Sequence, residues 1–219
     1  MFLIFLTLCY YWVFLDLQCY LCADAIQLNY RTAKVVDLPG IAKLLTKTFE
    51  DDIPSWNILQ SKIVENKYEK QLRKRMKELV QSPGVHHALV VACTNDTNQI
   101  AGFMELGTMP SPLATCNETK GRPERPYLAN LAVDKDFRRQ KMGSKLVELA
   151  ILISAQWSMD KDVDAVIYLA VDKENKAAAQ FYDNLEFCRV MDETERLSKR
   201  AQRKLKRKPR LYFERKLDL

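Results

Sequence analysis

The stretch "YLANLAVDKDFRRQKMGSKL", residues 127–146, joins three local signals in a fixed order. Residues 127–133 are largely apolar, which is typical of a central strand buried on both faces. A basic loop follows, and Gly143 then opens a run with the apolar spacing of a helix. Because the N–H groups of a helix's first turn have no partner within the helix, a strand, a basic loop and a helix in succession favour anion binding.

The basic loop by itself does not distinguish a phosphate site from an ordinary turn. Arg138 and Arg139 would supply charge-assisted donors to a phosphate. A loop that holds phosphate commonly has more than one glycine, however, and Lys141 stands where a second would be expected. Basic turns before helices are common, so the surrounding segments have to decide between the two interpretations.

Hydrophobic periodicity predicts the elements on either side of this stretch. Residues 28–36 alternate as in a strand, and Asp37 is the expected N-cap of the helix that follows. Apolar residues about one helical turn apart predict an amphipathic helix over residues 58–80, and two apolar runs around a polar "TNDTN" predict a hairpin. Residues 163–171 have the composition of a second buried strand. A helix ending near Phe187 and two closing strands, "CRVM" and "RLYFERKL", follow.

The predicted order of elements is therefore β-α-α-β-β-β-α-β-α-β-β. Antiparallel pairs with one crossover between the two central strands predict an α/β fold, with a mixed, mostly antiparallel sheet and helices on both faces. The chain has 219 residues, 47% of them hydrophobic, and is long enough to bury one such core.

The first 25 residues differ in composition from the rest of the chain. Residues 2–15 are apolar apart from one threonine, and Asp16 interrupts the run too early for a membrane span of about 20 residues. The "ADA" that ends at Ala25 resembles a cleavage site, so residues 1–25 are interpreted as a secretory signal peptide and residues 26–219 as the folded domain. No Lys or Arg lies near the first methionine, which leaves open an uncleaved anchor or a misassigned start codon, the latter implying the cytosol.

The positive charge is concentrated in one segment. The run from Arg196 to Arg210 contains nine basic and no acidic residues, and subtracting nine from the net charge of +6 leaves −3 for the remainder. An acidic protein substrate, a ribosome or a nucleic acid would be attracted to it. A solvated, charge-rich helix is the alternative, and the run has no interleaved aromatic residue of the kind that stacks on single strands.

Cysteines and histidines do not form a metal-binding pattern. The six cysteines are scattered, and His86 and His87 are the two histidines, so no zinc-ligand spacing exists and no metal is expected. Cys93 and Cys188 are predicted to be buried free thiols, and the two histidines are predicted to lie on the surface.

Four segments taken together resemble the GNAT superfamily of acyl-CoA-dependent N-acetyltransferases. They are the strand "YLANLAV", the loop "FRRQKMG", the strand "IYLAV" and the helix "NKAAAQFYDNLEF", in this order. The loop pattern of the family, Arg/Gln-x-x-Gly-x-Gly/Ala, is matched at Arg138 and Gly143 and departs at Lys141. The resemblance covers residues 28–217 and is specific over 127–187.

The family's second pattern is Asn-x-x-Ala-x-x-aromatic/aliphatic-Tyr ending in Gly-Phe. It is matched at Asn175, Ala178, Phe181 and Tyr182, and Glu186 stands where the family has glycine. The segments "IAGFMELG" and "PYLANLAV" look most like the plastid and cyanobacterial branch, which acetylates protein amines.

The resemblance implies a single GNAT-type domain whose central strands splay apart to admit acetyl-CoA, the acyl donor. The pantetheine arm would then pair like an added strand with the backbone of Leu131, Ala132 and Val133. The pyrophosphate would lie on the loop and the start of the next helix, and Asn175 is also expected at the cofactor. The loop residues concerned are Arg138, Arg139, Gln140, Lys141, Met142, Gly143 and Ser144.

Lys141 is expected to have little effect on cofactor binding. A helical conformation at this position would tolerate a side chain, so Lys141 is expected to point outward and leave binding unchanged or weakened.

Two residues are the candidates for catalysis by resemblance. Tyr182 would be the general acid for the departing thiolate, and its alternative is a core tyrosine beside Phe181. Glu105 would be the general base, acting on the amine through water, and its alternative is a solvent-facing strand residue. The backbone N–H of Leu131 would stabilise the oxyanion.

Three hypotheses for function follow. The first is an acetyl-CoA-dependent N-acetyltransferase that acts on protein amines, either lysine side chains or N-termini. The second is a degenerate acyl-CoA-binding module without catalysis, and the third is a basic nucleic-acid- or membrane-surface-binding protein on the same scaffold. A signal peptide would be reconciled with acetyl-CoA in an alga whose plastid import begins with one, although no long transit peptide follows Ala25.

Overall fold

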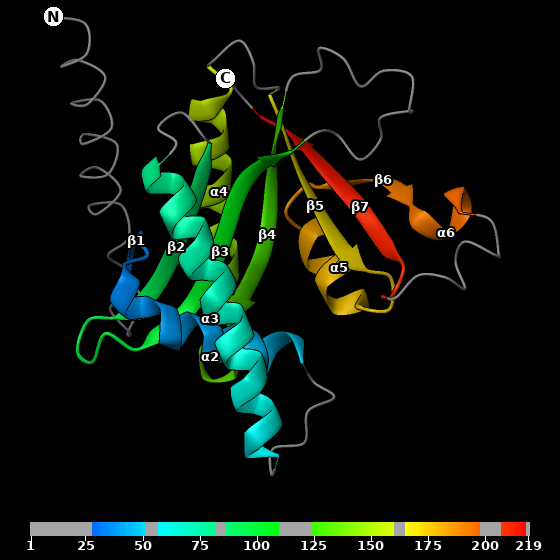
Figure 1. Ribbon diagram of the computed structural model, residues 1–219. Helices are drawn as coiled ribbons and strands as arrows, with labels where there is room; N and C mark the ends of the chain where they lie inside the picture. Colours follow the sequence, from blue (N-terminus) through cyan, green and yellow to red (C-terminus); the bar gives the residue numbers. More distant parts are fainter. Residues whose placement is uncertain are drawn as a thin grey trace, which may run out of the picture.

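A seven-stranded sheet with the order β1-β2-β3-β4-β5-β7-β6 forms the centre of the computed structural model (Figure 1). Its strands are β1 (Leu28–Thr32), β2 (His87–Thr94), β3 (Ile100–Met109), β4 (Arg125–Val133), β5 (Val166–Asp172), β6 (Cys188–Asp192) and β7 (Arg210–Lys216). Neighbouring strands are antiparallel except for β4 and β5, which are parallel. The predicted mixed, mostly antiparallel sheet is confirmed.

The structure describes residues 28–50, 57–81, 86–109, 124–159, 165–197 and 207–217. The signal-like segment 1–25 and most of the basic run, residues 198–206, lie outside the described residues. Their interpretations stay predictions.

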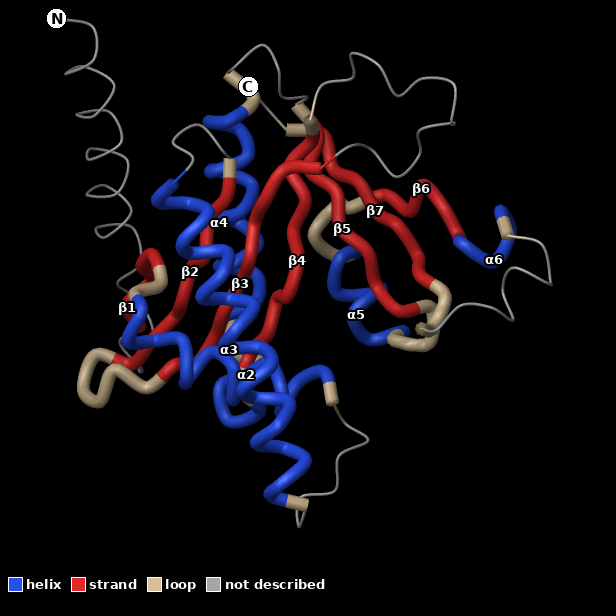
Figure 2. The backbone as a smooth tube through the Cα atoms, viewed as in Figure 1, coloured by secondary structure: helices blue, strands red, loops and turns tan. Residues whose placement is uncertain are grey.

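Helices cover both faces of the sheet, as predicted (Figure 2). The helices α2 (Leu38–Phe49) and α3 (Ile58–Gln81) lie on one face, where α2 packs against β3 and β4. The helices α4 (Met142–Trp157) and α5 (Lys176–Asp183) lie on the other. The short α6 (Glu193–Arg196) and two 3₁₀ turns, η1 (Val35–Asp37) and η2 (Lys135–Phe137), complete the secondary structure of the described residues.

Each face of the sheet has its own hydrophobic core. On one side, Phe103 and Ala132 pack with the buried faces of α2 and α3. On the other side, Leu146 and Ala150 of α4 pack with Tyr182 of α5 and with Leu169 of β5. Strand β4 contributes to both cores, with Leu128 on the α4 side and Ala132 on the other.

One buried hydroxyl in the α4-side core makes no hydrogen bond among the described residues. Ser154 is fully buried, and its Oγ has no partner. Because an unsatisfied buried hydroxyl is costly, Ser154→Ala is expected to raise the unfolding free energy by about 1 kcal/mol. Urea unfolding measures this, with Ser158→Ala as the matched control: its Oγ donates to the Ser154 carbonyl at 2.9 Å, and its loss should destabilise. If Ser154→Ala instead lowers the unfolding free energy, the Ser154 hydroxyl must have a hydrogen-bond partner.

The central strands β4 and β5 separate soon after they meet. Only Tyr127 with Tyr168 and Leu128 with Leu169 are paired, and the two strands diverge towards their carboxyl ends (Figure 1). The expected splay of the central strands is therefore present, and it leaves the last part of β4 paired with β3 alone.

Three local predictions need correction. Asp37 does occupy the N-cap of α2, but its carboxylate makes no cap bond there; it instead pairs with Arg31 at 2.6 Å and accepts from the Lys34 N–H. The strand predicted to reach Val36 ends at Thr32, since η1 reverses the chain. Cys93 is buried as predicted, whereas Cys188 is exposed because it begins the edge strand β6.

Candidate active site

The hydroxyl of Tyr182 belongs to a buried aromatic cluster next to the diverging strands. Tyr182 is 7% exposed on α5, and its ring lies 5.1 Å from that of Phe181 and 5.6 Å from that of Phe187. Burial, and secondarily the Tyr127 hydroxyl, raise the pKa of Tyr182 well above its usual value. The phenol is therefore protonated at neutral pH and can donate a hydrogen bond.

Tyr127 is a further tyrosine at the point where β4 and β5 separate. It pairs in register with Tyr168, whose hydroxyl accepts a hydrogen bond from Arg125. Burial raises the pKa of Tyr127 as well, against the opposing effect of nearby Arg210. Tyr127 is not among the predicted site residues, since an aromatic residue in an apolar strand is usual for a core.

The basic loop leads from the end of β4 directly into α4. Arg138 folds back so that its Nε donates to the Val133 carbonyl at 3.1 Å, and both Arg138 and Arg139 are exposed. Lys141, at the N-cap of α4, makes no side-chain cap bond. The unpaired N–H groups of the first turn and two exposed guanidinium groups fit a pyrophosphate.

The start of α4 lies tightly against α5. A Cβ atom built at Gly143 would meet the Phe181 ring at 3.3 Å and the Val133 side chain at 3.8 Å. Glycine at this position therefore permits the close approach of the basic loop, β4 and the helix that carries Tyr182. Met142 is buried in the α4-side core, so it can offer only backbone groups to a ligand.

The expected conformation of Lys141 is wrong. Its φ of 58° lies in the left-handed region, and Arg139 and Glu186 also have positive φ values of 62°. The loop turns back towards the sheet before α4 begins, and glycine would adopt this backbone without a steric cost. Both positions at which the chain departs from a family glycine thus keep the glycine-like conformation.

Returning glycine to these positions is expected to stabilise the fold. Lys141→Gly should raise the unfolding free energy by about 1 kcal/mol, since it relieves a left-handed backbone at an exposed residue. Glu186→Gly should gain less, because it also removes the 2.8 Å ion pair with Arg215. Urea unfolding of both variants measures the difference, and a loss of stability in Lys141→Gly would contradict the strain argument.

Asn175 is the N-cap of α5. Its side-chain oxygen accepts from the Ala178 N–H at 3.0 Å, so this oxygen is committed to the helix. Asn175 is exposed, and its side-chain NH2 group is the part that a ligand could contact.

Glu105 lies at the centre of a polar cluster on the opposite face of the sheet from Tyr182. It is 1% exposed, and its carboxylate accepts from Asn130 Nδ2 at 2.6 Å, lies 3.0 Å from His87 Nε2, and pairs with the Arg75 guanidinium of α3. The alternative of a solvent-facing strand residue is therefore wrong, because α3 covers this part of β3.

The two histidines are also not surface residues. His87 is half-buried and bonded to Glu105, and burial lowers its pKa, so it is neutral at pH 7. His86 packs its ring 5.2 Å from that of Trp157. Neither packing could be predicted from a short polar pair at the start of a strand, because the partners come from distant elements.

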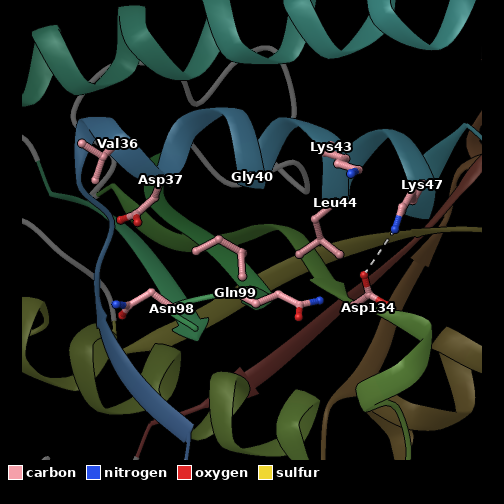
Figure 3. A pocket seen from close by; sticks show the side chains of 10 residues that line it. Val36, Asp37, Gly40, Lys43, Leu44, Lys47, Asn98, Gln99 and Asp134 are labelled. Atoms are coloured by element: carbon pink, nitrogen blue, oxygen red, sulfur yellow. Dashed lines mark ion pairs between the residues drawn. The ribbon is translucent and has the colours of Figure 1, made fainter. Parts of the chain in front are cut away.

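The described residues also contain a pocket that neither Tyr182 nor Glu105, the two predicted catalytic residues, lines. It has a volume of about 390 Å³ and lies between α2 and the β2–β3 turn, with Lys43, Lys47 and Gln99 at its rim (Figure 3). Lys47 forms a 3.7 Å ion pair with Asp134 across it.

No group of three or more His, Cys, Asp or Glu side chains among the described residues could hold a metal ion. No helix in this part of the chain is long and apolar enough to cross a membrane.

Solved structures share this fold at low sequence identity. The ribosomal-protein-S18-alanine N-acetyltransferase of Escherichia coli superposes with a TM-score of 0.55 at 16% identity, covering 88% of this chain and 96% of that one. NAA60 of Arabidopsis thaliana, solved with a bisubstrate analogue, gives a TM-score of 0.57 at 14% identity, covering 88% and 99%.

A curated relative and a family model give the sequence-level comparison. N-alpha-acetyltransferase 30 of Dictyostelium discoideum is 39% identical over 67 residues, which is 31% of this chain and 34% of that protein, so about a third of the relative is matched. The model of the acetyltransferase (GNAT) family matches residues 40–187, more than half of the chain. This match includes the diverging strands, the basic loop and the helix of Tyr182, and the chain belongs to the acetyltransferase (GNAT) family.

Proposed function

We propose that this protein transfers an acetyl group from acetyl-CoA to a protein amine by direct attack in a ternary complex, and that its preferred acceptor is an N-terminal α-amine. The observation that carries the proposal is the end of β4–β5 pairing at Leu128, with Tyr182 packed beside it and the start of α4 adjoining the same end of β4. One end of the sheet thus combines an open strand edge, an anion-binding helix terminus and a proton donor.

The chain's backbone is suited to hold the acyl donor. Ala132 and Val133 pair with β3 but not with β5, so their outer backbone groups can pair with an extended pantetheine arm. The loop from Arg138 to Ser144 would hold the pyrophosphate, and the N–H of Leu131 would donate to the carbonyl oxygen. When bound, acetyl-CoA supplies an activated thioester carbonyl.

Tyr182 would act on the leaving group. Its hydroxyl is kept protonated by burial, and it would donate its proton to the departing thiolate. Burial in the same apolar surroundings would also raise the pKa of the departing thiol. The pKa of the thiol would then lie closer to that of Tyr182.

Glu105 would accept the proton of the amine through water. Its carboxylate already has three donors around it, and Arg75, with a side chain that is 48% exposed, is the one most readily displaced. We propose that Arg75 moves aside when an acceptor binds, which would open the carboxylate to a bridging water.

The preference for an N-terminal amine rests on proton affinity and on the relatives. An α-amino group has a pKa of about 8 and a lysine one of about 10.4, so far more of the N-terminal amine is neutral at pH 7.5. The curated relative is described as an N-alpha-acetyltransferase. Assignment to a plastid or cyanobacterial branch rests on the hairpin and β4 segments alone.

The described end of the basic run at Arg207 and Lys208 is partly neutralised. Arg207 forms a two-bond contact with Glu193 at 2.7 and 2.8 Å, and Lys208 lies 3.0 Å from Glu174. Contact with an acidic acceptor, a ribosome or a nucleic acid would therefore depend on residues 198–206.

Thiol release from acetyl-CoA tests the proposed function against the alternatives. We expect free thiol to accumulate only when an acceptor peptide is present, and acetyl-CoA at 100 times its Kd to stabilise the fold by about 2.7 kcal/mol. Stabilisation without thiol release would favour the non-catalytic acyl-CoA-binding module. Stabilisation by a polyanion but not by acetyl-CoA would favour the nucleic-acid-binding alternative.

A further inference from the structure

The strand β4 contains a bulge at the point where it leaves β5. In the β3–β4 ladder, Glu105 pairs with Ala129 and Phe103 with Ala132, so β4 advances three residues while β3 advances two. The register gives neither Asn130 nor Leu131 a partner on β3. A bulge bends its strand and increases the local twist, so this one redirects the backbone just beyond the last β4–β5 pair.

Asn130 has a left-handed backbone within this strand. Its φ is 50°, a value that few non-glycine residues adopt and that asparagine tolerates better than most. A positive φ in the middle of a strand does not persist unless the surroundings hold it. The side chain of Asn130 provides such a hold, because its Nδ2 donates to Glu105 Oε2 at 2.6 Å.

Glu105 is itself fixed from two other directions. Arg75 reaches it from α3 and His87 from β2, and the carboxylate is almost fully buried. The Asn130 side chain therefore connects the bulge to the Glu105 carboxylate, which residues of α3 and β2 also bind.

We propose that Asn130 is a positioning residue: its bond to Glu105 holds the β4 bulge in the shape that aims the N–H of Leu131 at the reacting carbonyl. The inference rests on the proposed acetyl transfer. Ala132 and Val133, which come after the bulge and remain in register with β3, are not controlled by this bond. Loss of the bond should therefore affect turnover and leave cofactor binding largely unchanged.

Two variants of Asn130 separate the bond from the backbone conformation. Asn130→Gly keeps the left-handed conformation accessible and removes the donor. Asn130→Asp keeps the size of the side chain but places a second carboxylate against Glu105, so the bond becomes a repulsion. Asn98→Gly is the matched control, because Asn98 also has a left-handed φ, 52°, and lies on the exposed β2–β3 turn.

Steady-state kinetics and acetyl-CoA titration provide the first readout. We expect kcat to fall about 10-fold in Asn130→Gly and about 100-fold in Asn130→Asp, with KM and Kd for acetyl-CoA changed by less than about 3-fold. Asn98→Gly should keep the wild-type kcat. A wild-type kcat in Asn130→Gly, or an equal loss of cofactor affinity and turnover, would overturn the proposal.

Backbone NMR of the protein without ligands provides a readout that does not depend on activity. The amide resonances of residues 130 and 131, which have no partner on β3, should shift in Asn130→Gly and stay in place in Asn98→Gly. Unchanged resonances in Asn130→Gly would overturn the proposed role of the bond. If the wild-type protein acetylates no amine but these resonances shift, the proposed function fails while the role of Asn130 in holding the bulge stands.

Discussion

Replacing Tyr182 with phenylalanine is expected to lower kcat about 100-fold while the Kd for acetyl-CoA stays within about 2-fold of wild type. Phenylalanine keeps the ring contacts with Phe181, Phe187 and Phe213, so the fold and the cofactor-binding backbone should be retained. Only the proton donor for the departing thiolate is lost. Steady-state kinetics and isothermal titration measure the two quantities.

Tyr68→Phe is the matched control for this variant. Tyr68 also carries a partly buried hydroxyl, which donates to Glu50 at 3.1 Å, and burial raises its pKa to about 12. It packs in the core on the opposite face of the sheet from Tyr182, and its hydroxyl bonds to Glu50, so its loss should leave kcat unchanged. Equal kcat values for Tyr182→Phe and wild type would remove Tyr182 from the mechanism and leave it as a core residue.

Replacing Glu105 with glutamine is expected to lower kcat about 100-fold and to remove the rise of kcat/KM with pH that a general base produces. Glutamine has the same volume and can still accept the bond from Asn130, so the bulge should be kept. The variant loses the charge that accepts the proton and pairs with Arg75. Kinetics from acid to alkaline pH measure the change.

Asp37→Asn is the control for losing a buried carboxylate. Asp37 is 7% exposed and is paired with Arg31, whose hydrogen bond lowers the pKa of the carboxyl. Its replacement should reduce stability and leave the pH profile of catalysis intact. A Glu105→Gln enzyme with the wild-type pH profile would show that Glu105 is structural and that another group accepts the proton.

The sheet was predictable because its signals are local. The apolar strand before the basic loop, the polar turn between two apolar runs and the spacing of the long helix each depend on residues that are close in sequence. The strands and the longer helices therefore follow the predicted order, with shifts of a few residues at the ends, whereas the short α6 between the last two strands was not predicted.

The polar cluster around Glu105 was not predictable for the opposite reason. Its members come from α3, β2, β3 and β4, and each one alone has the sequence features of a surface residue. Only the packing of α3 over the sheet buries Glu105 and half-buries His87. Asn130 is a polar residue within an apolar strand, and this was the one local sign of the bulge.

The conformation of Lys141 shows a related limit. Sequence comparison indicated that a glycine was missing, but the backbone that glycine serves depends on how the loop returns to the sheet. The structure keeps a left-handed φ at both Lys141 and Glu186, so the family's backbone shape persists without its glycines. Side-chain identity was a poor guide to conformation at these two positions.

Acetyl transfer between two matched peptides is the most direct test of the proposed function. One peptide has a free N-terminus and no lysine, and the other has a blocked N-terminus and one internal lysine. With acetyl-CoA, fragmentation mass spectrometry should locate an acetyl group on the α-amine of the first peptide, formed at least 10 times faster than any product of the second. Binding of acetyl-CoA without acetylation of either peptide would contradict the account.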